Sequence, residues 1–373
     1  MVDIRNLLML TCIPGIGSNR VRQLISHFKN SKDVFYASPK ELIQIEGFNK
    51  KLAYKITNFK NTPEFKKAEE YSNHQLSKLN KIGGRIITYW DNEYPELLKK
   101  IFDPPPFIFV LGKLEKVDRY SIAIVGTRNP SRYGISVTEK FTTELVQMGI
   151  PIVSGLARGI DTIAHSTVLK NGGRTIAVIG SGLDVIYPPE NKNLFWKIAE
   201  NGAIISEYEM GAQPDAVNFP RRNRIISGIS LGTLVIETGI DGGAMITAQT
   251  AFDQNREVFA IPGLITESRS NGCNTLIRDN RAKLVITVED ILNELGNKLK
   301  PILKIPTKID SKPEPDLTLF EKKIYELLND EPTHIDLIAE KSGLSVSDVL
   351  VNLLNLEFKG VVKQLPGKMF VRS

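Results

Sequence analysis

Apolar and polar positions change their period along the chain. Residues 1–78 place apolar side chains at the spacing of helices, interrupted by turns that contain glycine. From residue 80 onward, short runs rich in isoleucine and valine alternate with stretches of helical period. The last part of the chain returns to helical spacing. The pattern predicts a helical module, then an α/β domain, then a second small domain.

The strand-like runs of the central part leave room for one helix after each run. They are SIAIVG, PIVSG, TIAVIG, AIISEY, TLVIE, EVFAIPG and KLVIT. Such alternation is typical of a doubly wound parallel sheet with helices on both faces. We therefore expect a Rossmann-like α/β domain over residues 80–297. Residues 298–316, rich in lysine and proline without a period, predict a semi-rigid linker.

Residues 317–373 show three segments of helical period and then two strands joined by a Pro-Gly turn. This order is typical of a winged helix, whose third helix often enters a DNA major groove. Here 7 Lys and Arg stand against 8 Asp and Glu, and the third helix carries Asp348 and Glu357. Because phosphate contacts require basic side chains, we favour partner contact, self-association or regulation over groove reading.

Two similar hairpins occupy residues 1–78. The first, LLMLTCIPGIGSNRVRQLISHF, places Gly15 and Gly17 in a turn between two helices and looks like a helix-hairpin-helix unit of the SAM-like kind. Its N–H groups at a helix N-terminus form a possible phosphate site. The second copy, IEGFNKKLAYKI, has one glycine where the motif has two, which argues against a phosphate loop there. DNA contact and simple helical packing both stay open for this module.

Charge and cysteine content set further limits. The net charge is +6, and residues 1–78, with 13 basic against 7 acidic side chains, carry this excess, which is compatible with a polyanionic partner. Cys12 and Cys273 are not spaced for a disulfide framework or a metal site, so we expect a reducing compartment. Without an apolar run of membrane length or a cleavage-site pattern, a cytoplasmic protein with no membrane partner is expected.

Glycine-containing segments follow five of the predicted strands, and they begin at residues 126, 154, 180, 238 and 262. The carboxyl ends of parallel strands share one edge of the sheet, so these loops should converge on one cleft. Arg128 and Arg158 add the charge that a phosphate requires. One glycine after a strand merely makes a tight turn, but five loops with two arginines favour an anion site.

The segment FPRRNRIISGIS adds three arginines at the start of an apolar helix. Because burial of an unpaired guanidinium is costly, we expect Arg221, Arg222 and Arg224 to share one groove with Arg128. Some of these arginines would bind ligand phosphates, while others would form structural pairs. The acidic candidates for such pairs are Glu207, Glu237 and Asp184.

Phe219, beside these arginines, offers a flat face for a base, and a plain core phenylalanine is the alternative. A dinucleotide fingerprint at Gly180 and Gly182 is incomplete, since Val185 stands where the third glycine belongs. P-loop nucleotide hydrolysis lacks its motif, the four histidines are scattered, and Ser181 is not in a nucleophile elbow. We expect no cofactor, no metal and no catalytic residue.

Six ordered motifs resemble the DNA-processing protein A (DprA/Smf) family over roughly residues 80–296. They are GTRNPSRYG, SGLARGIDTIAH, GSGLDVIYPPEN, ISEYEMGAQPDAVNFPRRNRIISGIS, IETGIDGGAMITAQTAFDQNREVFAIPG and NGCNTLIRDNRA. The resemblance implies a protein, not an enzyme, that binds single-stranded DNA in natural transformation. It also implies protection of incoming strands, loading of the RecA recombinase and a homodimer formed through the Rossmann-like domain.

The family's basic pocket, carried onto this sequence, is the Gly-Thr-Arg loop with the other glycine loops and the FPRRNR segment. The DNA-binding residues predicted in this way are Gly126, Thr127, Arg128, Ser154, Gly155, Arg158, Gly180, Ser181, Gly182, Phe219, Arg221, Arg222, Arg224, Gly242 and Gly243.

A nucleotide-binding enzyme is the alternative function. Phosphoribohydrolases of the same superfamily resemble this chain at a PGGxGTxxE motif, whose glutamate does the chemistry. Aligning their glycine pair on Gly242 and Gly243 puts Gln249 at the place of that glutamate. An amide cannot act as a general acid or base, so hydrolysis would depend on Glu237 as a substitute.

Overall fold

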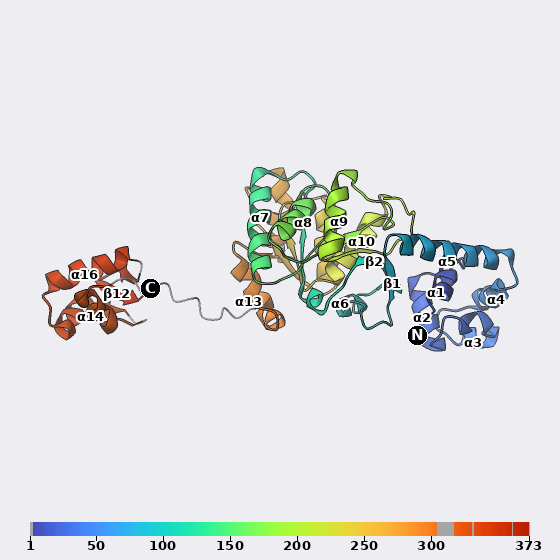
Figure 1. Ribbon diagram of the computed structural model, residues 1–373, viewed down its shortest axis with the longest axis horizontal. Coiled ribbons are helices and arrows are strands. Elements are labelled where there is room, and N and C mark those ends of the chain that lie inside the picture. Colours follow the sequence, from blue (N-terminus) through green and yellow to red (C-terminus); the bar gives the residue numbers. More distant parts are fainter. Residues whose placement is uncertain (1–2, 304–316, 330–331, 360, 373) are drawn as a thin grey trace. The chain divides into compact units, whose positions relative to one another are not determined.

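The computed structural model describes residues 3–303, 317–329, 332–359 and 361–372. The chain divides into two compact units, Met1–Leu303 and Lys304–Ser373, both drawn in Figure 1. The first unit holds the helical module and the α/β domain, and the second is the winged helix. Among the residues described, no helix has both the length and the apolar character needed to span a bilayer.

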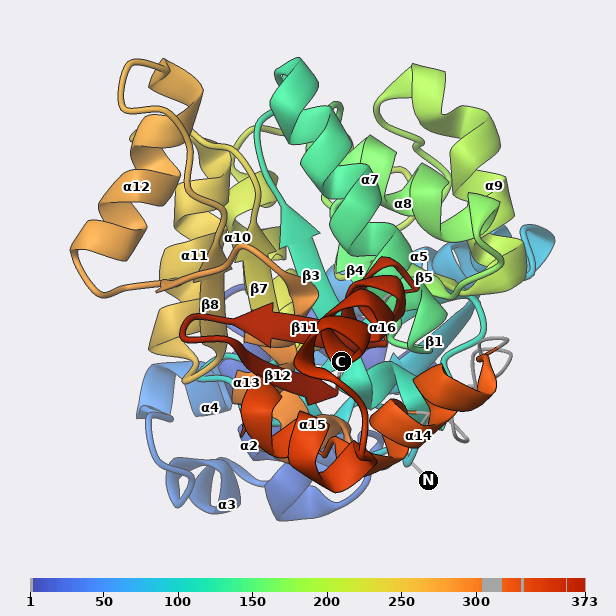
Figure 2. The same ribbon diagram turned by 90° about the vertical axis from the view of Figure 1, so that its left-hand side faces the viewer.

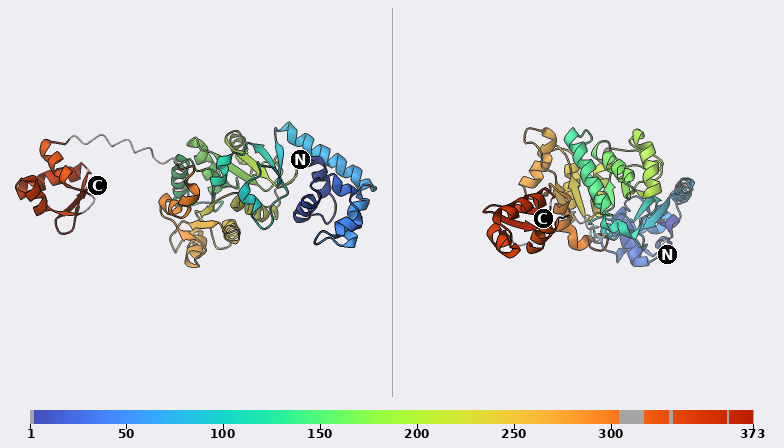
Figure 3. Two further views of the ribbon diagram at one scale, coloured as in Figure 1. Left: turned by 90° about the horizontal axis from the view of Figure 1, so that it is seen from below. Right: turned by 60° about the vertical axis from the view of Figure 1, so that its left-hand side comes forward.

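The first unit begins with the helical module. Its helices are α1 (Ile4–Thr11), α2 (Ser18–Phe28), α3 (Pro39–Ile43), α4 (Lys50–Phe59) and α5 (Pro63–Lys81). The two predicted hairpins are the α1–α2 and α3–α4 pairs, and the long helix α5 then leads into the first strand (Figure 3). Helix α5 continues without a break through residue 78. The domain boundary expected at that residue stays a prediction.

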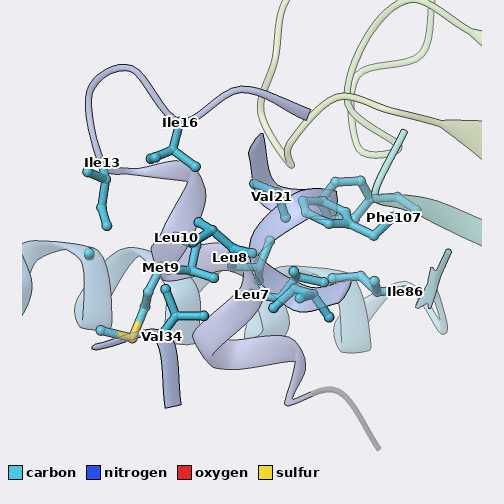
Figure 4. Close-up of a cluster of buried hydrophobic side chains, with 14 of the residues drawn as sticks. Leu7, Leu8, Met9, Leu10, Ile13, Ile16, Val21, Val34, Ile86 and Phe107 are labelled. Atoms are coloured by element: carbon cyan, nitrogen blue, oxygen red, sulfur yellow. The ribbon is translucent and has the colours of Figure 1, made fainter. Parts of the chain in front are cut away.

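The module and the edge of the sheet share one hydrophobic core. Leu7 and Leu8 of α1 pack in the same buried cluster as Ile86 and Phe107, which belong to the first two strands (Figure 4). All four side chains are buried. Burial of this apolar surface, at roughly 25 cal/mol per Å², fixes the module against the α/β domain.

The α/β domain is built on a nine-stranded sheet in the order β1-β2-β6-β5-β4-β3-β7-β8-β9. Its strands are β1 (Arg85–Thr88), β2 (Phe107–Gly112), β3 (Ile122–Val125), β4 (Ile152–Ser154), β5 (Thr175–Ile179), β6 (Ala203–Ser206), β7 (Gly232–Val235), β8 (Glu257–Ala260) and β9 (Lys283–Leu284). From β6 to β9 all neighbours are parallel, which confirms the doubly wound sheet. The sequence did not predict β1 and β2, which form an antiparallel edge.

Helices cover both faces of this sheet (Figure 2). One face packs against α7 (Arg132–Gln147), α8 (Ile160–Lys170), α9 (Lys192–Asn201) and α13 (Val288–Leu299). The other packs against α6 (Glu96–Lys99), α10 (Asn218–Gly228), α11 (Gly243–Asp253) and α12 (Asn271–Arg278). Along β3, Ile122 and Ile124 face the first group, whereas Ala123 and Val125 face the second. Such alternation places apolar side chains in both layers.

The last helix of the first unit corrects the expected start of the linker. Helix α13 extends to Leu299, which is fully buried, so residues 298 and 299 belong to the folded domain. Ile302 and Leu303 also pack against this core. The rest of the predicted linker, residues 304–316, lies outside the described residues.

The second unit has the predicted order of three helices and a hairpin. Its elements are α14 (Leu319–Leu327), β10 (Thr333–His334), α15 (Ile335–Ser342), α16 (Val346–Phe358), β11 (Val362–Leu365) and β12 (Met369–Arg372). The short β10 joins the hairpin in a three-stranded sheet of order β10-β12-β11. Val349, Leu353 and Phe370 lie at the centre of its own core and are fully buried.

Candidate nucleic-acid interface

The direction of strand succession reverses between β3 and β7. The chain first builds β4, β5 and β6 on one side of β3, then crosses through α10 to β7 on the other side. The loops after β3 and β7 therefore separate and leave a pocket of about 300 Å³ at the carboxyl edge. Ligands of open α/β sheets bind at such a switch point. We call this cavity the switch-point pocket.

Residues from several loops line the switch-point pocket. They include Gly126, Thr127, Arg128, Asp161, Phe219, Arg222, Asn223, Thr238, Gly239, Gly242, Gly243 and Thr247. A smaller adjoining pocket is lined by Arg128, Gly155, Arg158, Gly180, Ser181, Tyr187, Phe219 and Arg222, among others. The structure thus brings most of the predicted loops together, although their role in DNA binding stays a prediction.

Phe219 lies where the two pockets meet. Its ring is partly exposed, so it is not a plain core residue. The guanidinium carbons of Arg128 and Arg222 lie 5.6 and 5.7 Å from the ring centre. Tyr187 adds a second ring at 5.9 Å between centroids. Tyr187 was not among the predicted site residues, although it stands five residues after Gly182 in the same loop.

Arg128 is the cation of this site that is free to meet a ligand. Within the described part of the chain it has no carboxylate partner, and it borders both pockets. Arg158, which lines the smaller pocket, instead forms a two-point ion pair with Glu190. This exposed pair raises the pKa of Arg158 and lowers the pKa of Glu190. The charge of Arg158 is therefore already balanced by a carboxylate, unlike that of Arg128.

Helix α11 begins directly at the switch-point pocket. Gly242 is its N-cap residue, and no side chain caps this end, so N–H groups of the first turn remain for a ligand. A Cβ atom at Gly242 would lie 2.2 Å from Thr238 Oγ1, so only glycine fits. Gly180 has a related role, because a Cβ atom there would lie 3.2 Å from the Phe219 ring.

Arg222 lines both pockets together with Arg128, as expected, but its guanidinium is buried. Its side chain is 4% exposed, and Nη1 donates to the carbonyl oxygens of Gly155 and Val178. Asp161, also buried, accepts the N–H groups of Gly155 at 3.1 Å and Ala157 at 3.3 Å. Burial lowers the pKa of Arg222 to about 10 and raises that of Asp161. The two carbonyl acceptors and the nearby charge of Asp161 offset part of the cost of burying the guanidinium.

Arg221 and Arg224 do not share the groove of Arg128, so that expectation is wrong. Both line another cavity, of about 890 Å³, which also includes Tyr71 and Ser18 of the helical module. Successive residues of a helix are about 100° apart, so positions 219 and 222 of α10 share one face while 221 and 224 share another. Arg128 and Arg222 therefore line the switch-point pocket, whereas Arg221 and Arg224 line the other cavity.

Arg224 forms one of the structural pairs that the sequence left open. Its Nη2 donates to both carboxylate oxygens of Glu207, and its Nη1 donates to the carbonyl of Asp103. Burial raises the pKa of Glu207, and the Arg224 charge opposes that effect. This arginine ties α10 to the end of β6.

Two further predicted site residues lie away from both pockets. Ser154 is fully buried at the end of β4 and donates to the carbonyl of Ile124 at 2.7 Å. The N–H of Gly182 donates to the carbonyl oxygen of Ala212, in the loop after β6, at 2.9 Å. Each is held by the backbone of another segment, and neither lines the two pockets.

Glu237 is the residue on which hydrolysis would depend in the enzyme alternative. Its carboxylate is engaged in hydrogen bonds within the protein. It is 3% exposed, and its carboxylate accepts the N–H of Ser131 at 2.9 Å and the Ser131 hydroxyl. Its carbonyl accepts the N–H of Thr127 at 2.7 Å. These bonds brace the loop that carries Arg128. Gln249 bonds to Asp253, one turn along the same helix.

The surroundings of this site contain one buried histidine, His165. Among the described residues, no three His, Cys, Asp or Glu side chains are grouped as metal ligands. His165 is fully buried, with Nδ1 2.7 Å from the Thr175 hydroxyl. The Thr175 hydroxyl donates to the carbonyl of Ile152, so His165 is the donor in this contact. Burial and the Arg222 charge lower the pKa of His165 to about 3.

The two hairpins of the helical module differ as their glycines predict. Gly17 is the N-cap residue of α2, and no side chain caps that end. Lys55 and Arg20 border the turn through bonds to the carbonyls of Pro14 and Gly15. In the second hairpin, the Asn49 side chain accepts the N–H of Leu52, so that helix end already has a partner.

Three family models match the chain. DNA recombination-mediator protein A covers residues 85–296, the DprA winged helix domain covers 309–368, and the SAM-like helix-hairpin-helix tandem covers 7–59. Protein Smf of Synechocystis sp. is 37% identical over 96% of each chain. Protein Smf of Escherichia coli is 40% identical over 74% of each chain. DNA processing protein DprA of Streptococcus pneumoniae is 45% identical over 55% of this chain and 72% of its own length.

Two solved structures share the fold. The X-ray structure of DprA from Streptococcus pneumoniae superposes with a TM-score of 0.67 and 34% identity, covering 79% of this chain and 99% of that chain. DNA processing protein A from Helicobacter pylori, whose structure concerns its mode of binding single-stranded DNA, gives a TM-score of 0.53 and 30% identity. It covers 58% of this chain and 97% of that chain.

Proposed function

The chain belongs to the DNA recombination-mediator protein A family, and on this premise we propose that it binds single-stranded DNA at the switch-point pocket. The strand crosses Phe219, with phosphates at Arg128 and at the first turn of α11. One base lies against the Phe219 ring. Single-stranded DNA is the ligand of the similar Helicobacter pylori protein, which supports this choice.

The position of Arg128 is the observation that carries the proposal. Its guanidinium lies over the edge of the site at 5.6 Å from the Phe219 ring centre, beside a helix end that no side chain caps. A single strand without a fixed sequence requires charge for its phosphates and flat surfaces for its bases. Arg128, the α11 N-terminus and Phe219 provide both, so we expect little preference for base identity.

The predicted site residues divide into two roles. Those that contact the strand are Gly126, Thr127, Arg128, Arg158, Gly180, Ser181, Phe219, Gly242 and Gly243. Those that hold the loops are Ser154, Gly155, Gly182, Arg222 and Arg224. Arg221, exposed on the other face of α10, meets the strand only where it leaves the pocket.

The finer parts of the proposal concern assembly and pathway. Exposed apolar side chains after β7 and β8 support a homodimer through the Rossmann-like domain: Ile240 is 57% exposed, Leu264 69% and Ile265 88%. The protein acts in the cytoplasm, without catalysis, in natural transformation. There it protects incoming strands and passes them to the RecA recombinase.

A competition measurement tests the proposal. A fluorescent oligothymidylate bound to the protein should be displaced by unlabelled single strands of any sequence. The same length of duplex should compete much less well, because paired bases cannot stack on Phe219. Equal competition by duplex would contradict a site built for single strands. Protection of the bound oligonucleotide from a single-strand nuclease, and faster RecA filament growth on it, test the finer parts.

A further inference from the structure

Tyr187, in the loop after β5, is half-buried and lines the smaller pocket together with Phe219. The centres of the two rings are 5.9 Å apart, and their planes are inclined by 45°. A cation lies at each outer end of this pair. The guanidinium carbon of Arg128 is 5.6 Å from the centre of the Phe219 ring. That of Arg158 is 5.9 Å from the centre of the Tyr187 ring. Two neighbouring aromatic surfaces thus lie between two arginines.

The ring of Tyr187 does not serve the core of the first unit. Leu183, in the same loop, is buried in that core, and Ile186 packs against it. Tyr187 itself belongs to none of the apolar clusters formed by the described residues of this unit. The loop is therefore anchored by its aliphatic side chains, while its aromatic ring is directed to the pocket.

The inclination of the two rings decides how many bases they can hold. One flat base cannot lie against both rings, because their planes differ by 45°. The smaller pocket has a volume of about 10 Å³, roughly the space of one water molecule, so it cannot enclose a base between the rings. Each ring is therefore suited to a base of its own on its open face. Stacking of this kind is tolerant of sequence, since every base has a flat face.

Charge does not explain what this side of the site offers to a strand. Arg158 is paired with Glu190, so its charge is already balanced. Arg128, at the other end, has no carboxylate partner in the described part of the chain. The free charge is thus on the Phe219 side, and the side of Tyr187 offers chiefly a flat aromatic surface.

We propose that Tyr187 is a second stacking surface of the single-strand site, so that two successive bases lie on Phe219 and Tyr187 in turn. The inference rests on the proposed function, because it takes single-stranded DNA as the ligand of this site. Two bases held on inclined rings are splayed apart and do not stack on each other. Neighbouring bases of a duplex are stacked, so Tyr187 adds to the preference for single strands.

Titration of the full chain with fluorescent oligothymidylate tests this second surface. Tyr187→Leu should weaken binding by roughly five-fold or more, the effect of losing one stacked base. Tyr187→Phe keeps the ring and should bind nearly as well as the natural protein. The slope of log affinity against log salt should stay the same in both variants, because neither removes a phosphate contact. Unchanged circular dichroism spectra show that the variants are folded.

The Phe219→Leu background separates a direct contact from support of the neighbouring ring. A Tyr187 ring that holds its own base predicts a further several-fold loss when Tyr187→Leu is added to Phe219→Leu, measured at low salt, where binding is tightest. No further loss in the folded double variant would overturn the proposal, because Tyr187 would then act only through Phe219.

Arg128→Ala distinguishes failure of this inference from failure of the proposed function. Natural affinity of Tyr187→Leu, together with weak binding by Arg128→Ala, would overturn the second stacking surface and leave the DNA site in place. Natural affinity of both variants would overturn the DNA site itself, and with it the role of Tyr187.

Discussion

Arg222 holds Gly155 through its carbonyl oxygen, while the neighbouring Asp161 holds the same residue through its N–H at 3.1 Å. The loop after β4 is therefore fixed from both sides by two buried ionisable side chains, and the Arg222 charge also opposes the effect of burial on the pKa of Asp161. The loop that borders the proposed DNA site is thus held by internal contacts, whereas Arg128 has no carboxylate partner among the described residues.

Removal of the buried guanidinium should destabilise the protein strongly. Arg222→Ala leaves the buried carbonyls of Gly155 and Val178 without their donor, and a buried polar group without a partner costs roughly 1–3 kcal/mol. Urea denaturation of the full chain measures this change. Arg221→Ala, an exposed neighbour on α10, is the matched control and should change the free energy of unfolding by less than about 0.5 kcal/mol. Similar effects for both variants would contradict a structural role of Arg222.

The Phe219 ring should contribute to affinity without contributing charge. Phe219→Leu removes the flat surface, and loss of one base-stacking contact costs roughly 1–3 kcal/mol of binding free energy. Phe219→Tyr keeps the ring and should bind nearly as well as the natural protein. Anisotropy titration with oligothymidylate measures both. Equal affinity of the Leu and Tyr variants would show that no base stacks on this residue.

Glu237 should matter for stability and not for chemistry. Its carboxylate accepts two bonds from Ser131, and hydrogen bonds to charged groups contribute roughly 1.5–3 kcal/mol each. Glu237→Gln should therefore lower the melting temperature. Incubation of the natural protein with nucleoside monophosphates should release no free base, as followed by chromatography. Base release that Glu237→Gln abolishes would establish the enzyme alternative.

His165 should make stability depend on pH. Its pKa is lowered from 6.5 to about 3 in the folded protein, so the unfolded chain binds a proton more readily between these values. Stability that is present above pH 6.5 is then lost as pH falls toward 3, by at most about 1.4 kcal/mol per pH unit. The comparison with His165→Gln isolates this contribution, because other groups titrate equally in both proteins. Parallel stability curves between pH 7 and 5 would contradict it.

The sequence predicted the parallel sheet and the meeting of its loops, because strand order alone sends the ends of β3 and β7 to a common edge. It did not predict the antiparallel β1–β2 edge. The hydrogen bonds that define that edge join residues far apart in the chain, across the proline-rich turn before Phe107. Local periodicity carries no information about such pairing.

The spacing along α10 already indicated that Arg222 lies on a different side of the helix from Arg221 and Arg224. Ile225 and Ile226 of α10 are buried against the sheet, and Arg222 stands three and four residues before them. On a helix that spacing puts Arg222 on the buried side. The cost of burying a guanidinium argued against this position. The acceptors that remove this cost, the carbonyls of Gly155 and Val178, come from other loops and appear only in the folded chain.

The salt dependence of single-strand binding by Arg128→Ala tests the central claim most directly. For single strands, the slope of log affinity against log salt is about −0.7 for each phosphate neutralised. Arg128→Ala should weaken binding of oligothymidylate and make the slope less negative by about 0.7, while Arg158→Ala, whose guanidinium is paired with Glu190, should change both less. A folded Arg128→Ala protein with the affinity and the slope of the natural one would contradict the switch-point pocket as the DNA site.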